Sequence, residues 1–183
     1  VPADAAPGTD GRVRLVYSGS TAGWQSFGML RDLLDGWLTA RPELHVLFLS
    51  ARTPGIEALM AAHPGRVEAR WLDHARVGAA IAACDYGIMV RERTITNRVA
   101  SPTKFAEYLA SGLRVITNEG LGDLSAAVEQ HDLGVIVRGA EPPVLPPVTP
   151  AQRARARAHA RAHFTKPAYA AEYGRLKQVL AGG

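Results

Sequence analysis

Short apolar runs alternate with helical patterns along most of this chain, and that alternation restricts the fold more than any other feature. The runs have the length and the largely apolar character of strands in a covered sheet, and the run at 44–49 is nearly continuous in apolar residues. The runs lie at 13–17, 44–49, 67–72, 86–90, 114–117 and 134–137, with helical patterns between them. The sequence therefore predicts an α/β fold, a Rossmann-like, doubly wound parallel sheet of about six strands.

The chain divides into four segments by composition. Residues 1–12 resemble a linker, and 13–140 hold the strands and helices of the sheet domain. Residues 141–149 are rich in proline, which cannot occupy a central strand, so they form an extended connector. Residues 150–183 form one or two C-terminal helices, broken near 165–167. The first residue is not Met, and we expect a fragment of a longer protein.

One helix of the sequence begins like an anion-binding site. Ser101 can cap its N-terminus and Pro102 suits the first helical position, which leaves free amides at the positive end of the helix dipole. Lys104 adds a positive charge there, and Glu107 lies three residues on, along the same face. Gly112 ends the helix in the left-handed conformation. A cation for a diphosphate and an acceptor for hydroxyls suit a nucleotide-sugar, although a capped helix with a solvated Lys104–Glu107 pair explains the same residues.

Other candidate ligand contacts follow the strands, because ligands of open α/β sheets bind at the carboxyl ends of the strands. Gly19 would let the backbone approach a phosphate, and Ser20 could donate a hydrogen bond, although the same turn can be an ordinary one. Arg91 and Arg93 could clamp a diphosphate, or one of them could pair with Glu92 or Asp85 at the surface. After the fifth strand, Asp123 is expected to cap the next helix.

The sequence lacks the motifs of several functional classes. The chain contains neither the G-x-G-x-x-G loop of dinucleotide enzymes nor a Walker A loop. Its six histidines show no metal-ligand spacing, and His159 and His163 are interpreted as a surface pair. Cys84 lies in an Ala-rich helical pattern, typical of a small buried residue, and its solitary occurrence fits a reducing cytoplasm.

Arginines concentrate near the C-terminus, at 153, 155, 157 and 161, in a chain of net charge +4. A solvated helix face is the favoured interpretation. Association with a membrane surface is second, which would place the protein peripherally at the inner membrane face. No aromatic residues interleave with these arginines for base stacking, so we expect no nucleic-acid partner.

Three segments together resemble a known family. Residues 101–116, 120–123 and 133–137 look like the donor-binding half of GT-B glycosyltransferases, and most closely the retaining group called glycosyltransferase family four, or group 1. Its members carry a Lys/Glu helix, then A-x-G-x-P-V-I, then a Gly-rich loop before a short helix and strand. Residues 15–20 also resemble the first strand and loop of that domain, so the resemblance spans 13–137.

The resemblance implies roles for individual residues. Glu107 matches the second glutamate of the family's Glu-x7-Glu motif, which binds the ribose hydroxyls, while Val99 stands where the first would fall. Lys104 and Arg91 would stabilise the leaving diphosphate as catalytic residues. Arg114 replaces the family's proline before the next strand. The donor-binding residues implied are Gly19, Ser20, Ser101, Thr103, Lys104, Glu107 and Gly120.

The function implied is the donor-binding half of a retaining glycosyltransferase of polysaccharide biosynthesis. It would move a sugar from a nucleoside diphosphate sugar to an acceptor hydroxyl, without a metal or other cofactor. The acceptor site would belong to an N-terminal domain outside this chain, without which the fragment is inactive. Three alternatives remain open: a nucleotide-sugar 2-epimerase, a non-catalytic nucleotide- or sugar-binding module, and a flavodoxin-like domain.

Overall fold

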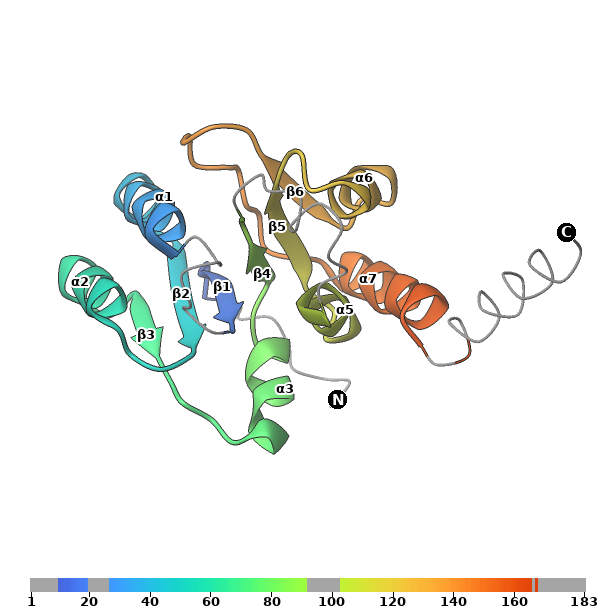
Figure 1. The fold of residues 1–183 in the computed structure, drawn as a ribbon, viewed down its shortest axis with the longest axis horizontal. Helices are drawn as coiled ribbons and strands as arrows, with labels where there is room; N and C mark the ends of the chain where they lie inside the picture. Colours follow the sequence, from blue (N-terminus) through green and yellow to red (C-terminus); the bar gives the residue numbers. More distant parts are fainter. Residues whose placement is uncertain (1–9, 20–26, 92–102, 166, 168–183) are drawn as a thin grey trace, which may run out of the picture.

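A computed structural model describes residues 10–19, 27–91, 103–165 and 167 of this chain. Its centre is a single six-stranded sheet in which every neighbouring pair is parallel, with the order β3-β2-β1-β4-β5-β6 (Figure 1). The strands are β1 (Val13–Ser18), β2 (Leu44–Leu49), β3 (Val67–Ala69), β4 (Tyr86–Met89), β5 (Arg114–Asn118) and β6 (Gly134–Val137). The prediction of a Rossmann-like, doubly wound parallel sheet is confirmed.

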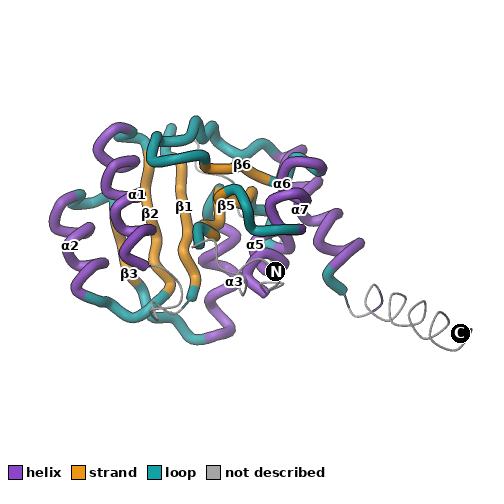
Figure 2. The backbone as a smooth tube through the Cα atoms, turned by 45° about the horizontal axis from the view of Figure 1, so that its top comes forward, coloured by secondary structure: helices purple, strands orange, loops and turns teal. Residues whose placement is uncertain are grey.

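Helices cover both faces of this sheet, so each face has its own apolar core. The helices are α1 (Phe27–Ala40), α2 (Pro54–Ala62), α3 (His74–Ala82), α5 (Thr103–Ala110), α6 (Asp123–Gln130) and α7 (Pro150–His163). Buried side chains of α1 and α2 pack in one core cluster, and those of α3, α5, α6 and α7 pack in the other. Figure 2 shows α1 and α2 grouped together, away from α3 and α5. Adjacent residues of β1 illustrate the two faces, because Leu15 belongs to the first cluster and Val16 to the second.

The element bounds follow the sequence pattern closely, and β3 and α2 show two larger differences. β3 stops at Ala69, although the apolar run predicted a strand as far as residue 72. It pairs only with β2, and that register ends at Phe48 and Ala69. The sequence pattern predicts a helix over 56–62, but α2 begins two residues earlier, because the Thr53 side chain accepts a hydrogen bond from the Ile56 amide and Pro54 occupies the first turn.

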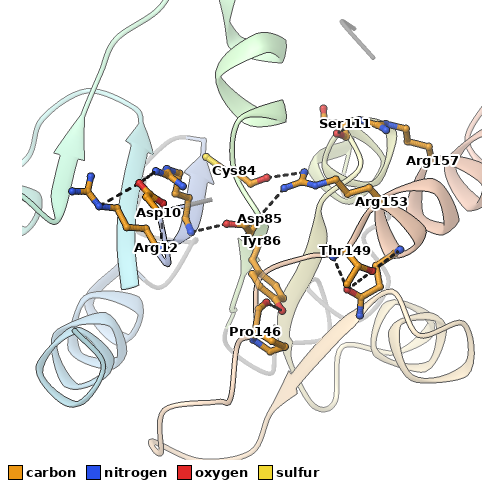
Figure 3. Close-up of polar contacts among 12 residues, drawn as sticks. Asp10, Arg12, Cys84, Asp85, Tyr86, Ser111, Pro146, Thr149, Arg153 and Arg157 are labelled. Atoms are coloured by element: carbon orange, nitrogen blue, oxygen red, sulfur yellow. Dashed lines mark hydrogen bonds and ion pairs between the residues drawn. The ribbon is translucent and has the colours of Figure 1, made fainter. Parts of the chain in front are cut away.

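The C-terminal helix is held by a buried ion pair, which corrects the prediction of a solvated arginine face. Arg153 is only 4% exposed, and its guanidinium donates to the Asp85 carboxylate at 2.8 Å and to the Cys84 carbonyl at 3.0 Å (Figure 3). The other Asp85 oxygen accepts from the Arg14 amide at 2.9 Å. Arg157 also turns inward, because its guanidinium packs over Gly112. The alternation of Arg with Ala does not indicate which arginine faces the sheet, so the burial of Arg153 could not be predicted from it.

Further hydrogen bonds hold the start of α7 and the segment before it. The Thr149 side chain and Gln152 form a capping box at the start of α7, as drawn in Figure 3. The Tyr86 hydroxyl donates to the Pro146 carbonyl at 2.8 Å, which ties the Pro-rich connector to β4. Cys84 is buried as predicted, and that burial raises the pKa of its thiol to about 12. Gly112 has the left-handed backbone conformation expected after α5, with φ of +84°.

His159 and His163 lie in a stack of three imidazole rings, because His131 at the end of α6 joins them. The ring centroid of His159 lies 4.3 Å from that of His163 and 4.8 Å from that of His131. Burial, and then the two neighbouring histidines, lower the pKa of His159 to about 4. The expected surface pair is therefore part of the contact between α6 and α7.

This stack predicts acid destabilisation. His159 binds its proton less tightly when folded, so its contribution to stability is complete above pH about 6.5 and is lost as the pH falls towards about 4. The urea midpoint, measured by circular dichroism, should fall across that window in the wild type and fall less in the His159→Gln variant. Identical pH profiles for the two proteins would contradict the expectation.

Candidate functional site

A large groove lies at the carboxyl ends of β1 and β2, on the side of the sheet that α3 and α5 cover. Its volume is about 1270 Å³. Its walls are formed by the residues after β1 and β2, the segment 71–75, α3 and one face of α5. The groove therefore occupies the position where open α/β sheets bind their ligands.

Two predicted site residues face this groove from α5. The Lys104 ammonium lies 2.8 Å from Glu107 Oε2, and both side chains are about one third exposed, at 35% and 37%. Both line the groove, together with Gly19 at the end of β1. The pair is thus part of a concave wall rather than a freely solvated surface pair. It can offer a positive charge to a phosphate and a carboxylate oxygen to a hydroxyl.

Tyr108 connects α5 to the end of β1. Its side chain is fully buried, and its hydroxyl oxygen accepts a hydrogen bond from the Ser18 amide at 2.9 Å. Burial raises the pKa of this phenol far above its ordinary value, so the hydroxyl stays neutral. Because Tyr108 follows Glu107 directly and Gly19 follows Ser18, this hydrogen bond helps to set the distance between two walls of the groove.

The other predicted site residues lie outside the groove lining or outside the described residues. Thr103 lines a second cavity of about 290 Å³ between α5 and α7, whose wall also includes Glu107. Gly120 lies in the turn before α6, with φ of +82°. Ser20 and Ser101 fall outside the described residues, as does Val99. The structure therefore brings Gly19, Lys104 and Glu107 together in one groove, and it does not bring Thr103 or Gly120 into that groove.

Arg91 follows β4 and lies outside the groove lining. Its amide donates to the Asn118 side chain at 2.9 Å. Burial lowers the pKa of its guanidinium, while the nearby Tyr17 and Tyr108 act in the opposite direction. The expected pairing with Asp85 is wrong, because Asp85 pairs with Arg153, whereas Glu92 and Arg93 fall outside the described residues.

The loop before α6 is held differently from the prediction. Gly122 occupies the N-cap position, and Asp123 is the first residue of the helix and makes no capping hydrogen bond. Instead, the Ser125 hydroxyl accepts from the Leu121 amide at 2.9 Å and donates to the Asn118 carbonyl at 3.1 Å. The positive φ of Gly122, +59°, explains the shift of one residue, because glycine adopts this conformation most readily.

Two residues of the groove, Trp71 and Asp73, were not predicted as site residues from the sequence. Both line the groove, and the Trp71 side chain is 80% exposed. Asp73 occupies the N-cap position of α3, as its residue type predicts, but its carboxylate makes no capping hydrogen bond. The available signal was a large aromatic residue two positions past the end of β3, inside the run that predicts a strand as far as residue 72.

None of the helices in the described ranges is long and apolar enough to cross a membrane. No group of three or more His, Cys, Asp or Glu side chains in the same ranges could hold a metal ion.

Comparisons by sequence find no relative, whereas the fold matches solved structures. No family model and no curated protein sequence matches the chain. The C-terminal domain of the glycosyl transferase group 1 family protein LpcC from Francisella tularensis matches with a TM-score of 0.51 and 12% identity, over 88% of this chain and 79% of that one.

Two longer glycosyltransferase structures are similar as well. WaaG, involved in lipopolysaccharide biosynthesis, has a TM-score of 0.54 at 15% identity, over 87% of this chain and 40% of WaaG. A UDP-forming α,α-trehalose-phosphate synthase from Burkholderia vietnamiensis has a TM-score of 0.61 at 12% identity, over 94% of this chain and 45% of the synthase. This chain thus spans less than half the length of either protein. It has the fold of the C-terminal domain of group 1 GT-B glycosyltransferases, the family that its motifs resemble.

Proposed function

We propose that this chain is the donor-binding half of a retaining glycosyltransferase, and that its groove holds a nucleoside diphosphate sugar. The observation that carries the proposal is the Lys104–Glu107 pair, which faces a groove at the carboxyl ends of the strands from one face of α5. A diphosphate needs a cation and close backbone approach, which Lys104 and Gly19 supply. The ribose hydroxyls need an acceptor, which Glu107 supplies.

The reaction would break the bond between the anomeric carbon of the sugar and its phosphate oxygen. An acceptor hydroxyl would form the new bond from the same face and give its proton to the departing phosphate oxygen, so the configuration is retained. Negative charge develops on the departing diphosphate, and the fixed charge of Lys104 would stabilise it more than it stabilises the bound donor. We assign Arg91, from the end of β4, a supporting role at the same phosphate.

The similar solved structures support this proposal, and their lengths support a separate acceptor domain. Their names describe glycosyl transfer in a group 1 protein and in lipopolysaccharide biosynthesis, and one of them forms UDP. Because WaaG and the synthase are more than twice as long as the matched region, we propose that a separate domain supplies the acceptor site. The chain alone would bind nucleotide weakly without turnover. Its cellular place would be the cytoplasm, in polysaccharide assembly.

Nucleotide binding tests this function directly. Titration calorimetry of the 183-residue chain with UDP, GDP and ADP should show binding of at least one of them. Lys104→Ala and Glu107→Ala should each weaken that binding by about 10- to 100-fold, because each removes a charged hydrogen-bonding group. Glu57→Ala is the matched control, since Glu57 is an exposed glutamate of α2 outside the groove lining, and it should leave the affinity unchanged.

Two results would contradict the proposal. One is the absence of binding by all three nucleotides at millimolar concentration. The other is binding that neither groove variant weakens, which would place the nucleotide elsewhere on the molecule.

A further inference from the structure

The wall of the groove after β3 presents a large aromatic surface to solvent. Trp71 is one of two large apolar side chains that are strongly exposed in the described part of the chain, and it lines the groove. A ligand that covered this indole ring would remove apolar surface from water, which is favourable. A planar ring at the edge of a nucleotide-sized groove offers a stacking surface for a nucleobase, and such stacking tolerates any base.

An exposed carboxylate lines the same groove as this ring. Asp73 is exposed, lines the same groove, and follows Trp71 by two residues. Its backbone is extended, with φ of −61° and ψ of 147°, and its side chain does not cap α3. Within the described ranges its carboxylate has neither a hydrogen bond nor an ion pair. Both of its oxygens are therefore available as acceptors at this end of the groove.

The three common bases differ in what they offer such a carboxylate. Guanine presents two adjacent donors, its N1–H and its 2-amino group, which match the two oxygens of one carboxylate. Uracil presents a single N–H between two carbonyl oxygens. Adenine presents an amino group beside a ring nitrogen that is itself an acceptor, and this nitrogen would face the second oxygen. A carboxylate at the base therefore favours guanine over uracil and adenine.

We propose that the groove selects guanine nucleotides, with Trp71 stacking on the base and Asp73 accepting from its N1–H and 2-amino group. The donor would then be a GDP-sugar. This inference rests on the proposed function, because Lys104 and Glu107 must hold the diphosphate and ribose for the base to reach the segment after β3. It assigns base selection to residues that have no part in the phosphate and ribose contacts.

Calorimetric titration of the whole chain with GDP, UDP, ADP and xanthosine diphosphate tests the assignment. GDP should bind at least about tenfold more tightly than UDP or ADP, the discrimination expected of a bidentate contact. Asp73→Asn should lose that preference and gain affinity for xanthosine diphosphate, because the new amide can donate to the 2-oxo group of xanthine. Trp71→Ala should weaken the binding of all four nucleotides by a similar factor. Asp32→Asn, an exposed carboxylate of α1, is the control and should change nothing.

The outcomes separate this inference from the function it rests on. If UDP or ADP binds more tightly than GDP and Lys104→Ala still weakens binding, the guanine assignment is overturned and the donor site stands. The assignment is also overturned if GDP is preferred but Asp73→Asn neither loses affinity for GDP nor gains affinity for xanthosine diphosphate. If no nucleotide binds, the proposed function fails as well. Circular dichroism spectra that match the wild type would exclude misfolding of the variants.

Discussion

Replacing Arg153 by alanine should lower the free energy of unfolding by about 3–5 kcal/mol, because removal of one partner leaves the other as an unpaired buried charge. Asp85 would be that charge, since it is only 2% exposed and the ion pair with Arg153 joins α7 to the residue before β4. The Cys84 carbonyl would lose its donor at the same time. Urea unfolding, followed by circular dichroism, measures the difference.

The matched control lies two residues further along the same helix. Arg155 pairs with Asp132, but both side chains are about half exposed, at 53% and 52%. Exposed ion pairs contribute about 1 kcal/mol or less, so Arg155→Ala should have a small effect. Equal destabilisation by the two substitutions would show that helix content or net charge, and not the buried pair, determines the stability.

Introducing a methyl group at Gly87 should have the second large effect. A Cβ atom there would lie 2.2 Å from the nearest ring carbon of Tyr108, a fully buried side chain held by the Ser18 amide. The ring cannot turn away without breaking that hydrogen bond, so α5 must shift. We expect Gly87→Ala to destabilise the fold by about 3 kcal/mol, towards the upper end for an overpacked core. Because α5 carries Lys104 and Glu107, nucleotide affinity should fall as well.

Gly36→Ala is the control for this substitution. Gly36 lies inside α1, is exposed, and has no heavy atom within 4 Å of the position that a Cβ would take. Alanine in a helix interior is more favourable than glycine by about 0.5–1 kcal/mol, so this variant should be slightly more stable than the wild type. Both free energies come from the same urea titrations. An unaltered stability of Gly87→Ala would contradict the close packing of Tyr108 against β4.

The sheet could be predicted from the sequence because most of its strands are buried and rich in apolar residues, although Glu68 of the edge strand β3 is exposed. The run at 44–49 coincides with β2, and those at 114–117 and 134–137 identify β5 and β6. Such patterns record burial directly, since a strand covered on both faces admits few polar residues. The motif residues Lys104 and Glu107 were predictable for a similar reason, because three residues separate neighbours on one helix face.

The remaining features depend on contacts between distant segments. Arg153 and Asp85 are 68 residues apart, and nothing local distinguishes Arg153 from Arg155 or Arg157. Trp71 reads as one more apolar residue of a strand, and only the pairing of β3 with β2 shows that the strand has ended before it. Asp73 carries the usual signature of a helix cap, and only the side-chain geometry shows that it does not act as one.

The central claim is that the groove between β1, the segment after β3 and α5 holds a nucleoside diphosphate. The most direct measurement is a titration of the ¹⁵N-labelled chain with GDP and UDP, followed by amide and indole NMR shifts. Saturable shifts should concentrate at Gly19, at the amides of Lys104 and Glu107, and at the Trp71 indole, while α2 stays unchanged. Shifts that avoid these positions, or spectra that do not change at millimolar nucleotide, would contradict the account.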